Sequence, residues 1–489
     1  MLFNSIEFIF LFLPISLFGY FLINRLFGKK GGMIYIGLTS LFFYGWWNPL
    51  YLGLIIPLLI VNFWLGKIQT RYYSKYLRGH QGLMIGSLLF NLGVLGYYKY
   101  LNFFVDNLNV LTQSHWVIEK CVLPLGISFF TFQKVGYLMD CYQGKSENYD
   151  FVDFSCFVLF FPQLIAGPIV HHAQIIPQFR ANNSNFNGRN FAMGLTIFSI
   201  GLFKKVGIAD PLSLVAQGVF NFVDGGGNPS MTLAWQGALA YTLQLYFDFS
   251  GYSDMAIGVG WMFNIQLPVN FNSPYQSRSI VDFWRRWHMT LSQFLRDYLY
   301  IPLGGNRCAA WKQKLNLLIT MVLGGLWHGA AWTFVLWGAL HGVFLIINHL
   351  WSEGTKSFKW KNNVLYQGAA WGITFLAVMV AWIYFRAPSV HCGNVMVQGL
   401  AGSYGVLSTA GGEGIPTKNK MILFSLVVAL FLPNTQRIVQ ATEYFIPMKL
   451  QKTWIEWEPN IVWAIGVGLL IAWAILHLSS ASEFIYFQF

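Results

Sequence analysis

Two histidines lie in the stretch GGLWHGAAWTFVLWGALHG, residues 324–342, which is otherwise almost wholly apolar and long enough to lie in a membrane. Ionisable side chains are costly at that depth and tend to mark functional sites. A neutral imidazole can accept a proton from an attacking hydroxyl near pH 7, and it can also act as a nucleophile. His328 follows Trp327 and has glycines on both sides, which would let a substrate or another backbone approach.

The residues leave two interpretations of His328 equally open. It marks a functional site, or it is hydrogen-bonded to a neighbouring helix while the glycines serve helix packing. For His341 and His349 the structural interpretation is the better one, and neither has the four-residue spacing from His328 of a helical metal-binding pair. The cysteines are scattered and contain no CxxC pair, so we expect no metal site and no disulfide framework. They are Cys121, Cys141, Cys156, Cys308 and Cys392.

The stretch VDFWRRWHMTLSQFLRDYLY, residues 281–300, predicts a cationic amphipathic helix in the plane of the membrane interface, with its basic face towards the cytoplasm. His288 falls at the inner edge of the apolar face, where a histidine taken alone is more often structural than catalytic. The polar face contains Asp282, Arg285, Arg286, Ser292, Gln293 and Arg296. The apolar face contains Trp284, Trp287, Leu291, Phe294, Leu295 and Tyr298.

Four further charged residues are candidates of lower rank. Asp248 and Asp254 lie in the apolar run YFDFSGYSDMAIG, where we expect the Ser-Gly pair between them to interrupt the helix. These carboxylates can orient an arginine or a histidine, or they can cap the helix break. We interpret Lys204 and Lys205 as anchors to anionic lipid.

The composition predicts the elements that position these side chains. Of 489 residues, 55% are hydrophobic and only 10% are charged, whereas an ordinary soluble domain is about one quarter charged. Apolar runs recur from end to end, so the chain is expected to be an all-α polytopic membrane protein. The net charge of +12 is spread over short clusters between these runs, which fits cytoplasmic loops and gives no support to nucleic-acid binding.

The first hundred residues predict simple spans. Residues 6–27 have no basic residue before them and no small-residue cleavage site after them, which indicates an uncleaved first span. The stretches 33–47 and 49–65 then form an out-and-back pair. One cluster of basic residues follows the first span, and a second cluster follows the out-and-back pair. Both loops are therefore expected in the cytoplasm, with the N-terminus outside. They are Arg25, Lys29 and Lys30, then Lys67, Arg71, Lys75 and Arg78.

The middle of the chain, residues 121–350, differs from the spans of 1–105 and 364–489. Its hydrophobic segments are interrupted by Pro, Gly and polar residues, as in PLGISFFTFQ, FPQLIAGPIV, YFDFSGYSDMAIG and IPLGGNR. Irregular backbone at membrane depth is tolerated only where protein buries it or water lines it. The clustering of these breaks therefore favours a cavity surrounded by simpler spans. The C-terminal spans are expected at 365–385, 421–433 and 461–477, with a loop at 399–420.

Three long stretches resemble the membrane-bound O-acyltransferase family, and most closely its bacterial alginate O-acetyltransferase branch. They are DFWRRWH at 282–288, RDYLYIPLGGNR at 296–307 and GGLWHGAAW at 324–332. PLGISFFTFQ, FPQLIAGPI, FDFSGYSDMAIG and the C-terminal EFIYFQF also resemble that branch, so the likeness runs nearly the full length. It implies one domain, 1–489, with tilted helices in a ring around a funnel entered from the cytoplasm.

The resemblance implies that His328 matches the hallmark histidine of the family and that His288 matches its second histidine. It assigns substrate binding to the residues around them, and the donor would be acetyl-CoA, with no permanently bound cofactor and no metal. A basic surface suits such an anionic donor. Whether His328 acts as a general base or carries the acetyl group covalently stays open. The substrate-binding candidates are Arg285, Arg286, Trp327, Arg296, Arg307, Asp248 and Asp254.

The chain contains no GxSxG nucleophile elbow and no long soluble region. In the family, acetyl groups that reach the outer face of the bacterial inner membrane typically pass to an extracytoplasmic acetyltransferase partner. That partner modifies a polysaccharide, with alginate as the first expectation and peptidoglycan, cellulose or another exopolysaccharide as the alternative. A secondary transporter would share the broken helices and buried histidines, but the internal symmetry that transporters often show is absent.

Overall fold

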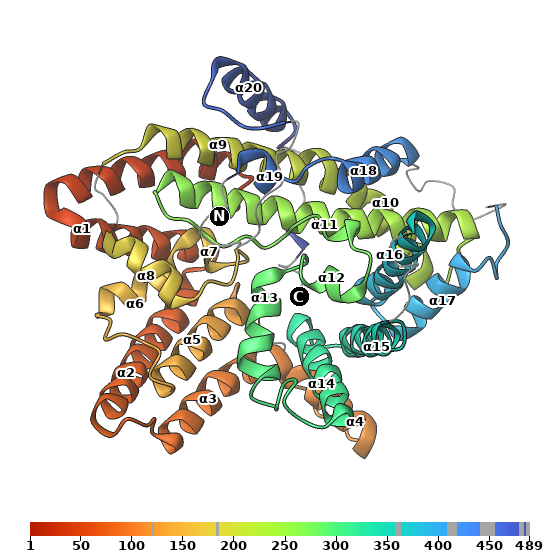
Figure 1. The fold of residues 1–489 in the computed structure, drawn as a ribbon, viewed down its shortest axis with the longest axis horizontal. Helices are drawn as coiled ribbons and strands as arrows, with labels where there is room; N and C mark the ends of the chain where they lie inside the picture. Colours follow the sequence, from red (N-terminus) through yellow and green to blue (C-terminus); the bar gives the residue numbers. More distant parts are fainter. Residues whose placement is uncertain are drawn as a thin grey trace. The chain divides into compact units, whose positions relative to one another are not determined.

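The computed structural model of the chain describes residues 1–119, 122–181, 185–356, 363–407, 418–440, 455–478 and 484–485. These residues fold into helices joined by turns and loops, with no strand among them (Figure 1). Five helices in this part of the chain are long and apolar enough to cross a membrane, which confirms the all-α polytopic fold class. They are Phe8–Gly45, Pro49–Tyr76, Gly188–Asp224, Trp332–Gly354 and Val364–Arg386.

Some expectations fall outside the described residues. These are Cys121, most of the C-terminal EFIYFQF stretch and the middle of the predicted loop 399–420. The described cysteines are free thiols, in agreement with the expected lack of a disulfide framework at these four positions. They are Cys141, Cys156, Cys308 and Cys392.

The chain divides into two compact units. The first comprises Met1–Leu202, Tyr252–Pro268 and Glu458–Leu478, and the second comprises Phe203–Gly251, Val269–Trp457 and Ser479–Phe489. Their boundaries differ from the three ranges expected from hydropathy, because one long helix contributes an end to each unit.

The first unit begins with a helical hairpin. Helix α1 (Leu13–Gly45) continues the π-helical turn Phe8–Phe12 and reverses at Gly28, where φ is 73° and ψ is 179°. The hydroxyl of Tyr35 donates to the carbonyl oxygen of Ile15 at 3.1 Å, across a separation of twenty residues that would span about 30 Å in a straight helix. The stretches expected as spans at 6–27 and 33–47 therefore form two helical arms, with the basic residues Lys29 and Lys30 at the turn between them.

Within the first unit, this hairpin packs against α2, α6, α7 and α8. Helix α5 packs against α2 and α3, while α6 packs against α1 and α8 (Figure 1). The expected break in PLGISFFTFQ is confirmed: Gly126 has φ 73° immediately before α5, where a Cβ would lie 2.9 Å from the carbonyl oxygen of Leu164. These helices are α2 (Leu52–Tyr76), α3 (Gln81–Leu95), α4 (Leu101–Thr112), α5 (Ile127–Tyr142), α6 (Phe151–Leu159), α7 (Phe161–Leu164), α8 (His172–Ala181), α9 (Gly188–Phe203) and α20 (Ile461–Leu476).

The second unit contains the helices that hold the candidate histidines. Helix α14 packs closely on α15, and α15 packs on α16 (Figure 1). A Cβ on Gly325 would collide with the carbonyl oxygen of Phe334, and one on Gly338 with that of Met321, so these glycines serve the close approach of two helices. The helices are α10 (Asp210–Asp224), α12 (Ile280–Trp284), α13 (Met289–Leu295), α14 (Ala310–His328), α15 (Trp332–Gly354), α16 (Val364–Arg386), α17 (Val390–Leu400), α18 (Asn419–Phe431) and α19 (Thr435–Val439).

The expected interruption of YFDFSGYSDMAIG is wrong. Helix α11 (Met231–Met262) runs without a break through Ser250 and Gly251. A serine and a glycine lower helix propensity by only about 1 to 2 kcal/mol in total. That cost is outweighed because almost every side chain in this part of α11 is buried, and tertiary packing supplies most of the stability of a helix in a protein.

The single amphipathic helix expected at 281–300 is also wrong. Helix α12 ends at Trp284, a turn follows, and α13 begins after His288, which has φ 42° and ψ 53°. The turn forms because its backbone bonds to the segment before it: the Asn272 amide donates to the Arg286 carbonyl at 2.9 Å, and the Met289 amide donates to the Asn270 carbonyl at 3.0 Å. The predicted division into two sides holds in part: Arg285 and Arg296 are exposed and Trp287 and Leu291 are buried, while the other members of both sides are mostly half-buried.

Candidate active site

The structure brings the two predicted histidines together. The ring centroids of His288 and His328 lie 6.3 Å apart, and both rings belong to the second unit. His328 is the last residue of α14 and is 4% exposed, whereas His288 precedes α13 and is fully buried. The sequence placed His288 at the edge of an amphipathic helix, and the left-handed turn instead directs it inward.

The side-chain amide of Asn270 orients His288. The Oδ1 atom of Asn270 accepts hydrogen bonds from the backbone amide of Thr290 at 3.3 Å and from its hydroxyl at 3.0 Å. The same oxygen lies 3.1 Å from Nδ1 of His288, so Nδ1 must carry the proton and donate it. In the neutral ring Nε2 is then the nitrogen with a lone pair, and it can accept a hydrogen bond or a proton.

Aromatic rings from three helices enclose His328. Its ring centroid lies 4.9 Å from Trp327, 5.1 Å from Trp337 and 5.2 Å from Phe385. These side chains come from α14, α15 and α16, and all three are at least nine-tenths buried. The enclosure would shield a reaction at the imidazole from bulk water.

His341, which the sequence analysis interpreted as structural, lies next to this enclosure. Its ring centroid is 4.8 Å from that of Trp337, which is itself in contact with His328. The indole N–H of Trp284 donates to Nδ1 of His341 at 3.3 Å, so the proton of the neutral ring is on Nε2. That N–H is buried and has no hydrogen-bond partner among the described residues. The four-residue spacing of Trp337 and His341 was the signal for this contact.

Three arginines of the second unit line a pocket of ≈ 730 Å³. Arg278, Arg286 and Arg437 face it together with one carboxylate, Asp282, which accepts a hydrogen bond from Nε of Arg286 at 2.9 Å. Partial burial and then the positive charge of Arg286 lower the pKa of Arg437. Three guanidinium groups that share one carboxylate leave an excess of positive charge, which suits an anionic ligand.

The four arginines predicted to bind the donor therefore have different surroundings. Arg286 lines the pocket, whereas Arg285 and Arg307 are exposed and are not among the residues that line it. Arg296 donates from Nε to Oδ1 of the adjacent Asp297 at 2.7 Å. Arg278 and Arg437 were not predicted from the sequence, because each is an isolated basic residue outside the stretches that resemble the family.

The interpretation of Lys205 as a lipid anchor is wrong. Its side chain is buried, and Nζ lies 2.8 Å from a carboxylate oxygen of Asp210 and 2.7 Å from one of Asp248. Asp248 also accepts a hydrogen bond from the backbone amide of Ile485 at 2.9 Å. It therefore orients a lysine, and not the arginine or histidine that we expected. Asp254 is buried on α11 within the first unit.

Comparisons with known proteins identify the relatives of this chain. Residues 83–393 match the model of the MBOAT, or membrane-bound O-acyltransferase, family. The chain is 40% identical to the peptidoglycan O-acetyltransferase of Helicobacter pylori, over 100% of this chain and 98% of the relative. It is 38% identical to a probable alginate O-acetylase of Pseudomonas putida, with both chains fully covered. A teichoic acid D-alanyltransferase of Streptococcus thermophilus is 29% identical, over 48% of this chain and 58% of the relative.

Proposed function

This chain belongs to the membrane-bound O-acyltransferase family, and we propose that it uses acetyl-CoA to acetylate a polysaccharide outside the bacterial inner membrane. It is a multi-pass membrane protein and an acyltransferase, which sets the transporter alternative aside. The observation that carries the proposal is the pairing of His288 and His328 in one buried cluster.

In the proposed reaction, an acceptor hydroxyl attacks the carbonyl carbon of the acetyl thioester. His328 takes the hydroxyl proton as general base, a carbon–oxygen bond forms, and the carbon–sulfur bond breaks. The sulfur leaves as a thiolate and receives a proton to give free CoA. The aromatic enclosure of His328 supports this role, because it limits access of water that would otherwise hydrolyse the thioester.

His288 is proposed to hold the donor. Because Asn270 keeps the His288 proton on Nδ1, Nε2 can accept a hydrogen bond from an amide N–H of the pantetheine arm of CoA. That contact would place the thioester within reach of His328, whose ring centroid lies 6.3 Å from that of His288. Positioning of this kind contributes to catalysis by fixing the distance and orientation of the reacting atoms.

The arginine pocket is proposed to receive the phosphates of the donor. Arg278, Arg286 and Arg437 can each donate paired N–H groups to phosphate oxygens. Arg286 is also only two residues before His288, so the same turn of chain would contact both ends of the donor.

The acceptor is proposed to be reached through an extracytoplasmic acetyltransferase partner. Alginate is the first candidate and peptidoglycan the alternative, since relatives at 38% and 40% identity carry those two names. Because a partner would make the final transfer to the polysaccharide, the identity of that polysaccharide would not change the chemistry at His328.

The test is a CoA-release assay on purified protein in lipid vesicles, with acetyl-CoA as donor and alginate or peptidoglycan fragments as acceptor, with and without candidate partner proteins. His328→Ala should lower the rate by roughly 10²–10⁴-fold, the usual contribution of a positioned base. His391→Ala, which removes an exposed histidine on α17, should leave the rate unchanged. A near-normal rate for folded His328→Ala protein would refute the assignment.

A further inference from the structure

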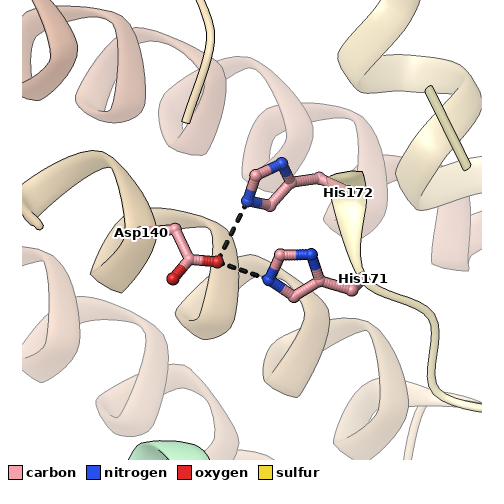
Figure 2. Close-up of side chains that lie close together, drawn as sticks. All are labelled: Asp140, His171 and His172. Carbon is pink, nitrogen blue, oxygen red and sulfur yellow. Dashed lines mark hydrogen bonds and ion pairs between the residues drawn. The ribbon is translucent and has the colours of Figure 1, made fainter. Parts of the chain in front are cut away.

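A second histidine pair lies in the first unit, where α5 ends and α8 begins. Figure 2 shows the rings of His171 and His172 directed at one carboxylate oxygen of Asp140. The Nε2 atoms lie 2.6 Å and 3.0 Å from that Oδ2 atom, and the two ring centroids are 4.3 Å apart. All three ligand-type atoms lie within 4.8 Å of one another.

We propose that Asp140, His171 and His172 bind a divalent transition-metal cation, with Zn²⁺ as the best match. Two imidazole nitrogens and one carboxylate oxygen form a ligand set that zinc accepts, with a fourth position left for water. Zinc holds such ligands at about 2.0–2.1 Å, which places neighbouring ligand atoms roughly 3.3 Å apart in a tetrahedron. The carboxylate oxygen would have to move back by less than about 1 Å, and the two nitrogens, which lie within 4.8 Å of each other, would have to approach by up to about 1.5 Å.

The hydrogen bonds show how the metal would replace protons. The backbone amide of Ala173 donates to Nδ1 of His171 at 3.2 Å, so without metal the proton of this ring is on Nε2 and is donated to Asp140. Binding would require that proton to move to Nδ1 and the ring to turn away from Ala173. The side chain of His171 is 37% exposed and has room to turn.

His172 needs the same proton shift but no turn of its ring, because its Nε2 also donates to Asp140 without metal. Its Nδ1 atom lies 3.1 Å from the hydroxyl of Tyr149, which can accept a hydrogen bond from Nδ1 once Nε2 binds the metal. A hydrogen bond of this kind commonly orients a metal-binding imidazole. The side chains of His172 and Asp140 are 1% and 4% exposed, so two rigid ligands lie beneath one accessible ligand. That arrangement provides an entry path for an ion.

The cluster lies at the end of the first unit that carries its basic turns. Lys30 of the hairpin turn pairs with Asp150 at 2.9 Å, only ten residues after Asp140. Gly144, four residues after Asp140, packs against Tyr73 near the basic end of α2. By the positive-inside rule this end faces the cytoplasm, so the metal would come from there. It would link the end of α5 to the start of α8.

The sequence does not reveal this site through a local pattern, because it contains neither a cysteine pair nor two histidines four residues apart at this place. The ligands are two adjacent histidines and an aspartate thirty-one residues earlier. Only the fold of the first unit brings these three side chains together.

The test uses full-length protein with an affinity tag that contains no histidine. After chelator treatment, Co²⁺ titration should give one bound ion per chain with the intense visible absorption of tetrahedral coordination, and Zn²⁺ should abolish that absorption. Zn²⁺ should also raise the unfolding temperature. His171→Gln, at the half-exposed ligand, should weaken Zn²⁺ binding at least tenfold, and Asp140→Asn should do the same. His391→Gln is the matched control and should bind like wild type.

Each outcome decides the proposal. Loss of the Co²⁺ absorption in folded His171→Gln protein supports it, and size-exclusion profiles identify variants that have simply failed to fold. A wild-type protein that takes up neither ion would overturn the proposal, and the three side chains would then form a hydrogen-bonded structural link only. Binding that persists unchanged in His171→Gln and Asp140→Asn would also overturn it, since other groups would then hold the ion.

Discussion

The two histidine pairs of this protein differ in the atoms that face them. His288 and His328 lie among aromatic rings, and Nδ1 of His288 contacts the uncharged amide of Asn270. His171 and His172 share a single carboxylate oxygen of Asp140. An apolar enclosure with a neutral amide leaves a nitrogen lone pair for proton transfer, whereas a shared carboxylate suits a cation. The same residue type is thus prepared for different chemistry by its partners.

The strongest test of the comparison is a double-mutant cycle on the first pair. His328→Ala should lose roughly 10²–10⁴-fold of the transfer rate, and His288→Ala should also impair it. Because residues that act as one unit are not additive when removed, adding His288→Ala to His328→Ala should cost little more. The measurement is kcat/KM for acetyl-CoA in all four proteins. If the two losses simply multiply, the rings act independently and the proposed unit does not exist.

The second test separates the orientation of His288 from its presence. Asn270→Ala removes the acceptor that keeps the proton on Nδ1, so the ring can turn or change tautomer. We expect a loss of roughly 10–100-fold, comparable to the loss of other groups that orient a functional imidazole. Asn270→Ala should lower kcat/KM and also change how kcat/KM depends on pH. A purely structural defect would lower the rate without changing its pH dependence.

Thr290→Val is the matched control for that variant. It removes one hydroxyl donor to the same Asn270 oxygen but keeps the backbone donor and nearly the same volume. The expected effect is therefore several times smaller than that of Asn270→Ala. Equal losses in the two variants would show that packing around Asn270 matters, and not its contact with His288.

The spans of this protein follow from sequence more directly than its sites do. The hairpin at Gly28 was predictable because two long apolar runs flank a basic turn, and such runs have one low-energy arrangement in a membrane. The turn at His288 was not, because it depends on hydrogen bonds to residues 270–272 that no local pattern reveals. An uninterrupted helix over 281–300 therefore predicts which side of the segment is apolar. It places His288 at the edge of that side, whereas the structure buries it fully.

The arginine pocket illustrates the same limit for binding residues. Arg286 was found because it belongs to a recognised stretch, whereas Arg437 is about 150 residues further along the chain. Only folding brings these two guanidinium groups into one pocket. Of the arginines predicted to bind the donor only Arg286 lines the pocket, and donor binding there stays a prediction.

The smallest predicted effect concerns that pocket. Arg278→Gln and Arg437→Gln should each raise KM for acetyl-CoA by about tenfold, the equivalent of ~1.5 kcal/mol for a hydrogen bond to a charged group. The rate at saturating donor should change little, because the phosphates are remote from the bond that breaks and contribute equally to ground state and transition state. Both effects should shrink as salt is raised, since screening weakens exposed ion pairs.

Arg189→Gln, at an exposed position on α9, is the control that removes an equal charge outside the pocket. Arg307→Gln distinguishes the donor site expected from sequence from the one that the pocket suggests. A large rise in KM for Arg307→Gln together with none for Arg437→Gln would move the phosphates to the exposed turn near residue 307. The reverse pattern would show that the donor binds at the turn that also positions His288. The comparison between the two histidine pairs would then include charge, because cationic groups would bind the donor near the first pair and an anionic group would bind a cation at the second.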